Sequence, residues 1–339
     1  MLRDIIQEVV EYDVFSHRWD EISGEPTYQD ISAGKRNASK FKKLTHFCEM
    51  SSKLGRKLAW VDTCCIDKTN AADLSEAIHG MYKWYANAYL CVVYLAESAS
   101  FADWDNESWF TRGWTLQELL APKRVKFYNK NWHPFTPPET DDDRKISSVI
   151  SPLENASGIS KAVFATDNSQ GVHRATCWEI MFWASRRQTT RVEDRAYCLI
   201  GLFRVSLTIT YGEGQRAFTR LVEAILAKNP SWDIFAWFGQ PSADHFALPS
   251  SPASYSRFEA DIGKDRAGVQ KPTITAHGLS LKSLPPIPME VCSVEDAKGP
   301  GEPFYVTLKT RSDSENTMGR YGNLVVECGA TRVKTIRNA

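Results

Sequence analysis

The sequence lacks an excess of charge of either sign. Its 339 residues contain 41 Lys and Arg and 41 Asp and Glu, so the formal net charge is zero. Proteins whose main function is to bind nucleic acid are usually basic, because they must neutralise phosphates. We therefore expect no nucleic acid as the main partner. A neutral chain also repels its own copies weakly, which favours association into a homo-oligomer.

Long apolar runs are also missing. No stretch approaches the length of about 18 apolar residues that a membrane span needs, and the first residues, MLRDIIQEVVEYDV, have no signal-peptide core. We expect a cytoplasmic protein with no membrane partner. A chain of this length, with 42% hydrophobic residues, exceeds one ordinary core and predicts two or three domains.

Several catalytic and metal-binding motifs are absent. The eight cysteines include no CxxC pair, and most lie within apolar runs, where cysteine acts as a small hydrophobic residue. Neither GxSxG nor a phosphate-binding loop occurs, and Gly212-Glu213-Gly214 lacks the third glycine of a dinucleotide fingerprint. We expect no metal and no bound cofactor.

The first 130 residues alternate short apolar runs with helical patterns. Such an order predicts an α/β fold with one parallel sheet and helices on both of its faces. The four expected strands are residues 12–16, 58–66, 90–95 and 124–128.

The remainder of the chain changes character twice. Residues 131–170 are rich in Pro, Asp, Ser and Asn, and residues 172–229 have helical patterns. From residue 232 onward Pro and Gly become frequent, and runs such as FYVTLKT alternate with a period of two. We expect an α/β domain over 1–135, a linker and helical domain over 136–231, and a β-rich region without catalytic groups over 232–339.

Polar residues gather where the predicted strands end. Open α/β sheets place their ligand sites at the carboxyl ends of the strands, so these residues are expected to form one site. The candidates are Ser16, His17, Trp19, Asp62, Asp67, Arg112, Trp114 and Glu118.

Each candidate also has a structural alternative. Thr115 and Glu118 fit a capping box, in which the glutamate only satisfies backbone N–H groups. His17 is equally compatible with a hydrogen-bonded histidine at a strand end, and Asp62 with a structural or a functional role. A metal-dependent hydrolase built on His17 with Asp62 or Asp67 is a weaker alternative, because the ligand spacing is unspecific.

Three segments resemble the fungal heterokaryon incompatibility (HET) domain over residues 10–130. They are YDVFSHRWD, LAWVDTCCIDKTNAADLSEAIHGMYKWYANAYLCVVYLA and WFTRGWTLQELLAPKRVKFYN. The segment RQTTRVEDRAYCLIGLFRVSLTITYGEGQRAF is similar to the region that commonly follows this domain. Asp20 stands where the family motif SHxWG has its glycine.

HET domains in turn resemble TIR domains, and this implies a TIR-like sheet. YDVFS is similar to the first TIR strand, and Trp114-x-x-x-Glu118-Leu119 is similar to a TIR motif whose glutamate is catalytic in NAD-cleaving members. The resemblance implies a fungal non-self-recognition and programmed cell-death effector of innate immunity. Glu118 would be the catalytic residue of an NAD nucleosidase, the other candidates would bind NAD as the substrate, and the alternative is a non-catalytic signalling module that acts by homotypic association.

Hydrolysis of NAD suits a site with a single carboxylate. Nicotinamide leaves as a neutral ring, so no general acid is required, and a carboxylate stabilises the oxocarbenium-like transition state. We also expect activity to need self-association. Trp104, Trp109 and Trp114 carry more aromatic surface than one short helix usually buries, which predicts an exposed interaction patch.

Overall fold

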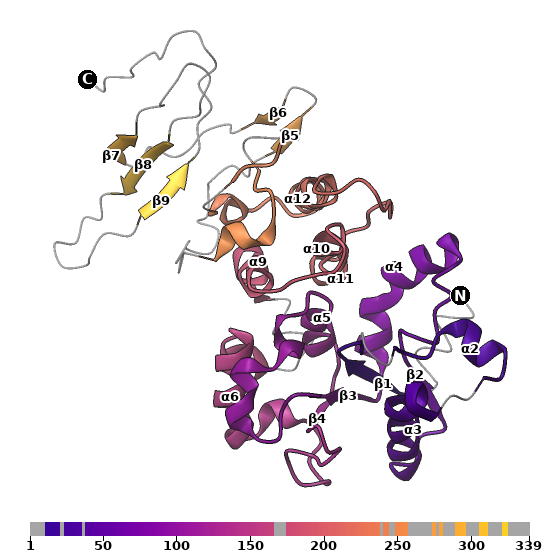
Figure 1. The fold of residues 1–339 in the computed structure, drawn as a ribbon. Coiled ribbons are helices and arrows are strands. Elements are labelled where there is room, and N and C mark those ends of the chain that lie inside the picture. Colours follow the sequence, from indigo (N-terminus) through magenta and orange to yellow (C-terminus); the bar gives the residue numbers. More distant parts are fainter. Residues whose placement is uncertain are drawn as a thin grey trace, which may run out of the picture. The chain divides into compact units, whose positions relative to one another are not determined.

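A computed structural model describes most of the chain (Figure 1). The described residues are 11–20, 24–35, 38–165, 174–237, 240–243 and 248–256, together with the backbone of five short strands between 273 and 324. The chain divides into two compact units, one made of residues 1–175 and 186–210, the other of 176–185 and 211–339. The boundaries expected at 135 and 231 stay a prediction.

The first unit contains a four-stranded parallel sheet, as the α/β prediction required. Its strands are β1 (Tyr12–His17), β2 (Leu58–Trp60), β3 (Leu90–Tyr94) and β4 (Val125–Tyr128), in the order β2-β1-β3-β4. The chain moves from β1 to one side of the sheet and then returns to the other side. The strand order therefore reverses between β1 and β3, which is the point where such sheets bind ligands.

Helices cover both faces of this sheet (Figure 1). Phe15 of β1 stacks on Phe47 of α3 (Ala38–Lys53), with ring centres 4.7 Å apart. Ser16, the next residue of β1, points to the opposite face and bonds to Glu118 of α5 (Thr115–Leu120). Helix α4 (Ala71–Asn87) packs beside α5 on that same face.

The helix ends follow the signals expected from the sequence. Asn70 caps α4, since its side-chain oxygen accepts hydrogen bonds from the backbone N–H groups of Ala72 and Asp73 at 3.0 and 3.4 Å. Gly55 follows α3 with a φ of +82°, a left-handed conformation that favours glycine.

Strand β2 is shorter than predicted, because only residues 58–60 of the expected 58–66 pair with β1. The N–H groups of Cys64 and Cys65 both bond to the carbonyl of Val61, at 3.3 and 2.9 Å, and this closes a turn. Val61, Cys64 and Ile66 are buried in that turn. An apolar run thus marked burial correctly but did not distinguish a strand from a packed turn.

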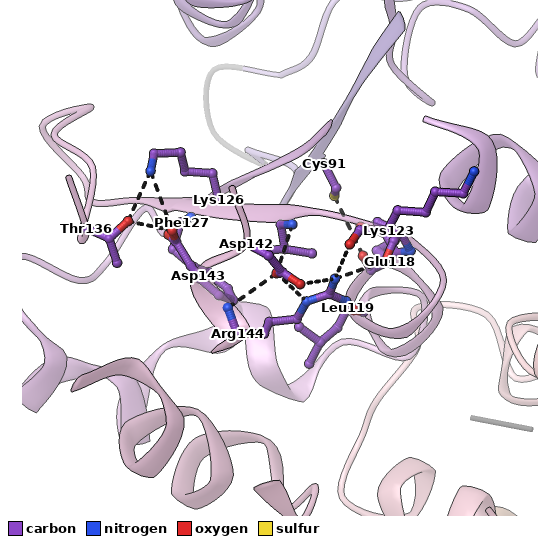
Figure 2. Close-up of polar contacts among 12 residues, drawn as sticks. Cys91, Glu118, Leu119, Lys123, Lys126, Phe127, Thr136, Asp142, Asp143 and Arg144 are labelled. Atoms are coloured by element: carbon purple, nitrogen blue, oxygen red, sulfur yellow. Dashed lines mark hydrogen bonds and ion pairs between the residues drawn. The ribbon is translucent and has the colours of Figure 1, made fainter. Parts of the chain in front are cut away.

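The segment that follows β4 begins with a 3-10 turn over Asp143–Lys145 that packs against β4. It continues with α6 (Ser147–Ser157), which packs against this turn and the 3-10 turn at Phe101–Asn106, and with α7 (Lys161–Phe164). Arg144 lies at its centre and bonds to the carbonyl of Leu119 at 2.7 Å (Figure 2). Two short helices, α10 (Asp194–Tyr197) and α11 (Ile200–Phe203), complete this unit.

The second unit contains α9 (Cys177–Ser185) and α12 (Arg216–Lys228), together with 3-10 turns at Trp232–Phe235 and Pro252–Tyr255. The backbone N–H of Trp178 donates to Asp233 at 2.7 Å, and the Tyr255 hydroxyl donates to the carbonyl of Ile234 at 2.6 Å.

Five short antiparallel strands are described in the C-terminal region. They are β5 (Thr273–Thr275), β6 (Gly278–Ser280), β7 (Met289–Glu295), β8 (Tyr305–Thr310) and β9 (Tyr321–Leu324). The residues between them lie outside the described part, so the β-rich character of 232–339 stays a prediction. Every helix within the described ranges is too short or too polar for a bilayer span.

Candidate functional site

A buried serine–glutamate pair lies at the carboxyl end of the central strand. The Ser16 hydroxyl donates to Oε2 of Glu118 at 2.5 Å, and Nε1 of Trp109 donates to Oγ of Ser16 at 2.9 Å. Ser16 belongs to β1 and Glu118 to the first turn of α5, so the pair joins strand and helix beside the point where the strand order reverses.

The surroundings of Glu118 shift its acidity into the neutral range. Burial raises the pKa of Glu118 to about 7, and the negative charge of Asp62 acts in the same direction. The Ser16 hydrogen bond and the positive charges of Arg112 and Arg187 partly oppose this rise in pKa. A carboxyl group with a pKa near 7 can be present in either ionisation state at neutral pH, as acid–base catalysis requires.

The capping-box alternative for Glu118 is wrong. Helix α5 begins at Thr115, whose hydroxyl donates to the carbonyls of Trp109 and Arg112 at 2.6 and 3.0 Å, and no side chain caps the helix. The Glu118 carboxylate accepts from Ser16 and not from the N–H of Thr115. Its position is therefore set by the strand and not by a helix cap.

An exposed tryptophan with two cations lies next to this pair. The Trp19 side chain is 39% exposed, and its ring centre is 3.7 Å from Nζ of Lys68 and 5.5 Å from the guanidinium carbon of Arg112. Nζ of Lys68 is also 3.7 Å from Oδ2 of Asp62. The arrangement offers an aromatic face and positive charge to a ligand that is itself aromatic and anionic.

A distant segment completes the site. The N–H of Gly113 donates to the carbonyl of Gln188 at 2.8 Å, and the N–H of Gln188 donates to the carbonyl of Thr111 at 2.7 Å. A Cβ atom on Gly113 would lie 2.4 Å from Cγ2 of Thr189, so the close approach depends on glycine. This contact places Arg187 beside the start of α5, where its Nη1 donates to the Arg112 carbonyl at 2.9 Å and to the Thr115 hydroxyl at 2.8 Å.

Sequence reasoning did not select Lys68 or Arg187. Lys68 was visible in the segment that follows the second predicted strand, directly after Asp67. Arg187 lies far in sequence from the predicted strand ends, and its position beside Arg112 depends on a contact across 75 positions of sequence. The only available signal was the resemblance of RQTTRVEDR to the region that follows HET domains.

Two predicted site residues lie elsewhere. His17 points to the α3 face of β1, where it stacks on Phe15 at 4.3 Å and its Nε2 lies 3.4 Å from Oε2 of Glu25. Asp67 accepts hydrogen bonds from Thr69 Oγ1 and Gln29 Nε2, both at 2.6 Å, in the turn before α4. The structure thus brings Ser16, Trp19, Asp62 and Arg112 together with Glu118, but not His17 or Asp67.

The position of Trp114 and the grouping of possible metal ligands complete the description of the predicted site residues. Trp114 is half-buried and lies one turn before Glu118, with helical backbone angles. In the part of the chain that the structure describes, no three His, Cys, Asp or Glu side chains are grouped so that they could hold a metal ion.

The tryptophan cluster does not form the expected exposed patch. Trp104 and Trp109 are 1% and 0% exposed, and they pack against Phe110 and Phe127. The segment is therefore part of the core under α5, and the reason for expecting association through these rings is removed.

Comparison with known proteins identifies a domain at the start of the chain, which includes Ser16, Trp19 and Asp62 of this site. Residues 12–103 match the family model of the heterokaryon incompatibility protein (HET). The chain is 39% identical over 229 residues to the vegetative incompatibility protein HET-E-1 of Podospora anserina; the match covers 63% of this chain and 16% of that protein. No solved structure matches the chain significantly. Residues 12–103 thus match the HET domain that the motifs predicted, and the chain spans about one sixth of the length of this relative.

Proposed function

We propose that this chain is an effector of fungal heterokaryon incompatibility whose HET domain hydrolyses the bond between nicotinamide and ribose in NAD. The family match and the likeness to a vegetative incompatibility protein support the biological role. Recognition of non-self followed by cell death, as a form of innate immunity, belongs to the same proposal. The α/β order β2-β1-β3-β4 and the spacing of Trp114 and Glu118 support its TIR-like aspect.

One observation carries the catalytic proposal. Glu118 lies at the carboxyl end of the central strand with its pKa raised by burial to about 7, next to an exposed indole and two cations. Perturbed carboxyl groups at such positions are typical of active sites. A nucleotide offers the matching chemistry, since it carries an aromatic base, a ribose and phosphates.

The reaction balances with water as the only co-reactant. The C1′–N bond breaks, its electron pair leaves with nicotinamide as a neutral ring, and positive charge develops on the ribose. Ionised Glu118 stabilises that charge, and water then adds at C1′ and loses a proton to the carboxylate or to solvent. The products are nicotinamide, ADP-ribose and one proton.

Incubation of the full chain with NAD tests the proposal. We expect nicotinamide and ADP-ribose in equal amounts from the wild type. We expect a fall in rate of about 100-fold or more in Glu118→Gln, because the charge that stabilises the transition state is lost. Glu97→Gln is the matched control, since Glu97 is an exposed carboxylate beyond β3 that pairs with Arg18 at 2.8 Å.

The rate should also be measured over a range of protein concentrations. A rise steeper than linear supports activation by self-association, which we propose by family resemblance. Absence of nicotinamide release at every concentration would contradict the catalytic proposal and favour the non-catalytic alternative, a signalling module that acts by homotypic association.

A further inference from the structure

Two of the three guanidinium nitrogens of Arg187 have no hydrogen-bond acceptor among the described residues. Its side chain is 8% exposed, and Nη1 donates to the Arg112 carbonyl and the Thr115 hydroxyl. No described residue accepts a hydrogen bond from Nε or Nη2, although both atoms are shielded from solvent. Buried donors without acceptors are rare in native proteins, because each one costs the energy of its lost hydration.

The two unused donors lie on the same edge of the side chain. In a planar guanidinium, the Nε–H and one Nη2–H bond point in the same direction and form a fork with two parallel donors. That fork matches two oxygens of one phosphate or carboxylate group. Shielding from water strengthens such a pairing, since both the cation and the bound oxyanion are then screened less.

The charges around the fork favour an anion from outside the chain. Glu118 is the carboxylate that senses the Arg187 charge, but it accepts its hydrogen bond from Ser16 and not from Arg187. Lys68 and Arg112 add two further cations around Trp19, and Asp62 lies 3.7 Å from only one of them. Three basic side chains thus surround this end of the sheet, and the Nε/Nη2 edge of the most buried one has no acceptor.

We infer that Arg187 is a phosphate-binding residue of this site and that the ligand is a nucleotide with a diphosphate, one phosphate of which occupies the Nε/Nη2 fork. The inference deepens the proposed function and rests on it for the identity of the nucleotide. Arg187 would hold the diphosphate, leaving the ribose within reach of Glu118 and the base near Trp19. A nucleoside without phosphates would lose this contact.

Binding measurements on the full chain test the inference without any need for turnover. ADP, inorganic pyrophosphate and adenosine are titrated by calorimetry into the wild type, Arg187→Lys and Arg186→Lys. Lysine keeps the charge but has no two-donor fork, so we expect ADP and pyrophosphate to bind Arg187→Lys at least about 10-fold more weakly and adenosine to bind unchanged. Arg186 is the exposed neighbour, and Arg186→Lys should bind all three probes like the wild type.

A second comparison uses only the wild type, in case Arg187→Lys does not fold. ADP should bind at least about 10-fold more tightly than adenosine, and pyrophosphate should compete with ADP. Equal affinity for ADP and adenosine, no binding of ADP or pyrophosphate, or unchanged ADP binding in a folded Arg187→Lys variant would each overturn the inference. Binding that depends on Arg187 without release of nicotinamide from NAD would retain this inference and contradict the proposed hydrolysis.

Discussion

Two buried arginines hold opposite ends of helix α5, and they differ in how completely the chain satisfies them. Arg144 lies at the C-terminal end, where Nε and Nη2 bond to the two carboxylate oxygens of Asp142 at 2.8 and 3.0 Å. Its Nη1 donates to the carbonyl of Leu119 at 2.7 Å (Figure 2). Nη2 also donates to the carbonyl of Pro122 at 3.0 Å. Each of its three nitrogens has a protein acceptor.

The neighbouring charges at the Arg144 end are equally well paired. Nζ of Lys126 donates to the Thr136 hydroxyl at 3.0 Å and lies 3.5 Å from Oδ1 of Asp143 (Figure 2). It also donates to the Pro137 carbonyl at 2.7 Å. Asp143 also accepts from the N–H of Phe127 at 2.8 Å. Such a network fixes β4 and the end of α5 and leaves no polar group for a ligand.

Arg187, at the N-terminal end of α5, lacks part of its set of hydrogen-bond acceptors. Two of its nitrogens have no acceptor among the described residues, and the pKa of nearby Glu118 is raised to about 7. Folded proteins satisfy structural polar groups internally, whereas sites for ligands retain unsatisfied ones. The comparison assigns the Arg144 end to stability and the Arg187 end to binding.

Replacement of the two arginines by methionine gives the largest expected effect. Arg144→Met leaves Asp142 buried without its cation and should lower the free energy of unfolding by about 3–5 kcal/mol. Arg187→Met removes a charge with no balancing acceptor on two of its nitrogens, and should cost less than about 2 kcal/mol. Urea unfolding of both variants measures the difference.

The exposed Arg186→Met is the control for loss of a surface charge and should stay within about 0.5 kcal/mol of the wild type. Asp142→Asn combined with Arg144→Met should cost less than the two separate losses added together, because the side chains act on each other. Equal losses for Arg144→Met and Arg187→Met would remove the distinction between the two ends of α5.

Glu118→Gln tests whether the ionised Glu118 carboxylate, at the Arg187 end of α5, lowers the stability of the fold. A carboxyl group whose folded pKa is raised from 4.5 to about 7 binds more protons in the folded than in the unfolded state between these pH values. Its contribution therefore falls as the pH rises through that window, and the loss is complete above pH 7. At pH 8 Glu118→Gln should be more stable than the wild type by up to about 3 kcal/mol.

The two proteins should become equally stable below about pH 4, where Glu118 is protonated in both states. Thermal unfolding across pH 4–8 measures this convergence, and the exposed Glu97→Gln should not reproduce the gain at pH 8. A variant that is less stable than the wild type at pH 8 would show that the Glu118 carboxylate contributes to the fold rather than to a strained site.

Much of the fold could be predicted from local patterns. Short, continuous apolar runs identified all four strands, because strands covered on both faces need such runs. Their alternation with helical patterns predicted that the strands are parallel. The end of β2 could not be predicted, since the apolar residues after Trp60 are buried in a turn with the same composition. The prediction of an exposed tryptophan patch was wrong for a similar reason. The burial of Trp104 and Trp109 depends on packing against Phe127, which is distant in sequence.

The site could be predicted in part. The strand-end rule selected five residues that lie together, Ser16, Trp19, Asp62, Arg112 and Glu118, but it also selected His17 and Asp67, which lie elsewhere. Alternation along β1 explains the difference between Ser16 and His17, because residues 16 and 17 of one strand must point to opposite faces. Arg187 could not be found by this rule, since a strand-end pattern does not include a segment that joins the site only through tertiary contact.

The smallest expected effect concerns two serines that bond to buried acids on opposite faces of β1. Ser16 donates to Glu118 at 2.5 Å, and Ser51 donates to Oδ2 of Asp13 at 2.6 Å. Burial raises the pKa of Asp13 to about 6, and the Ser51 hydrogen bond partly opposes the rise, as Ser16 does for Glu118. The two pairs are chemically alike, but only one lies beside Arg112 and Arg187.

Alanine at either serine should lower the free energy of unfolding by about 1–2 kcal/mol, because a buried hydrogen bond is lost. Ser16→Ala should also raise the pKa of Glu118 above 7, so the acid limb of the pH profile of nicotinamide release should move to higher pH. Ser51→Ala acts on Asp13, which faces α3, and should leave that profile in place. Rates measured from pH 5 to 9, with urea unfolding of both variants, separate the two. An equal displacement of the profile in both variants would mean that the acid limb reports the stability of the fold. Glu118 would then not be the group whose ionisation controls the rate.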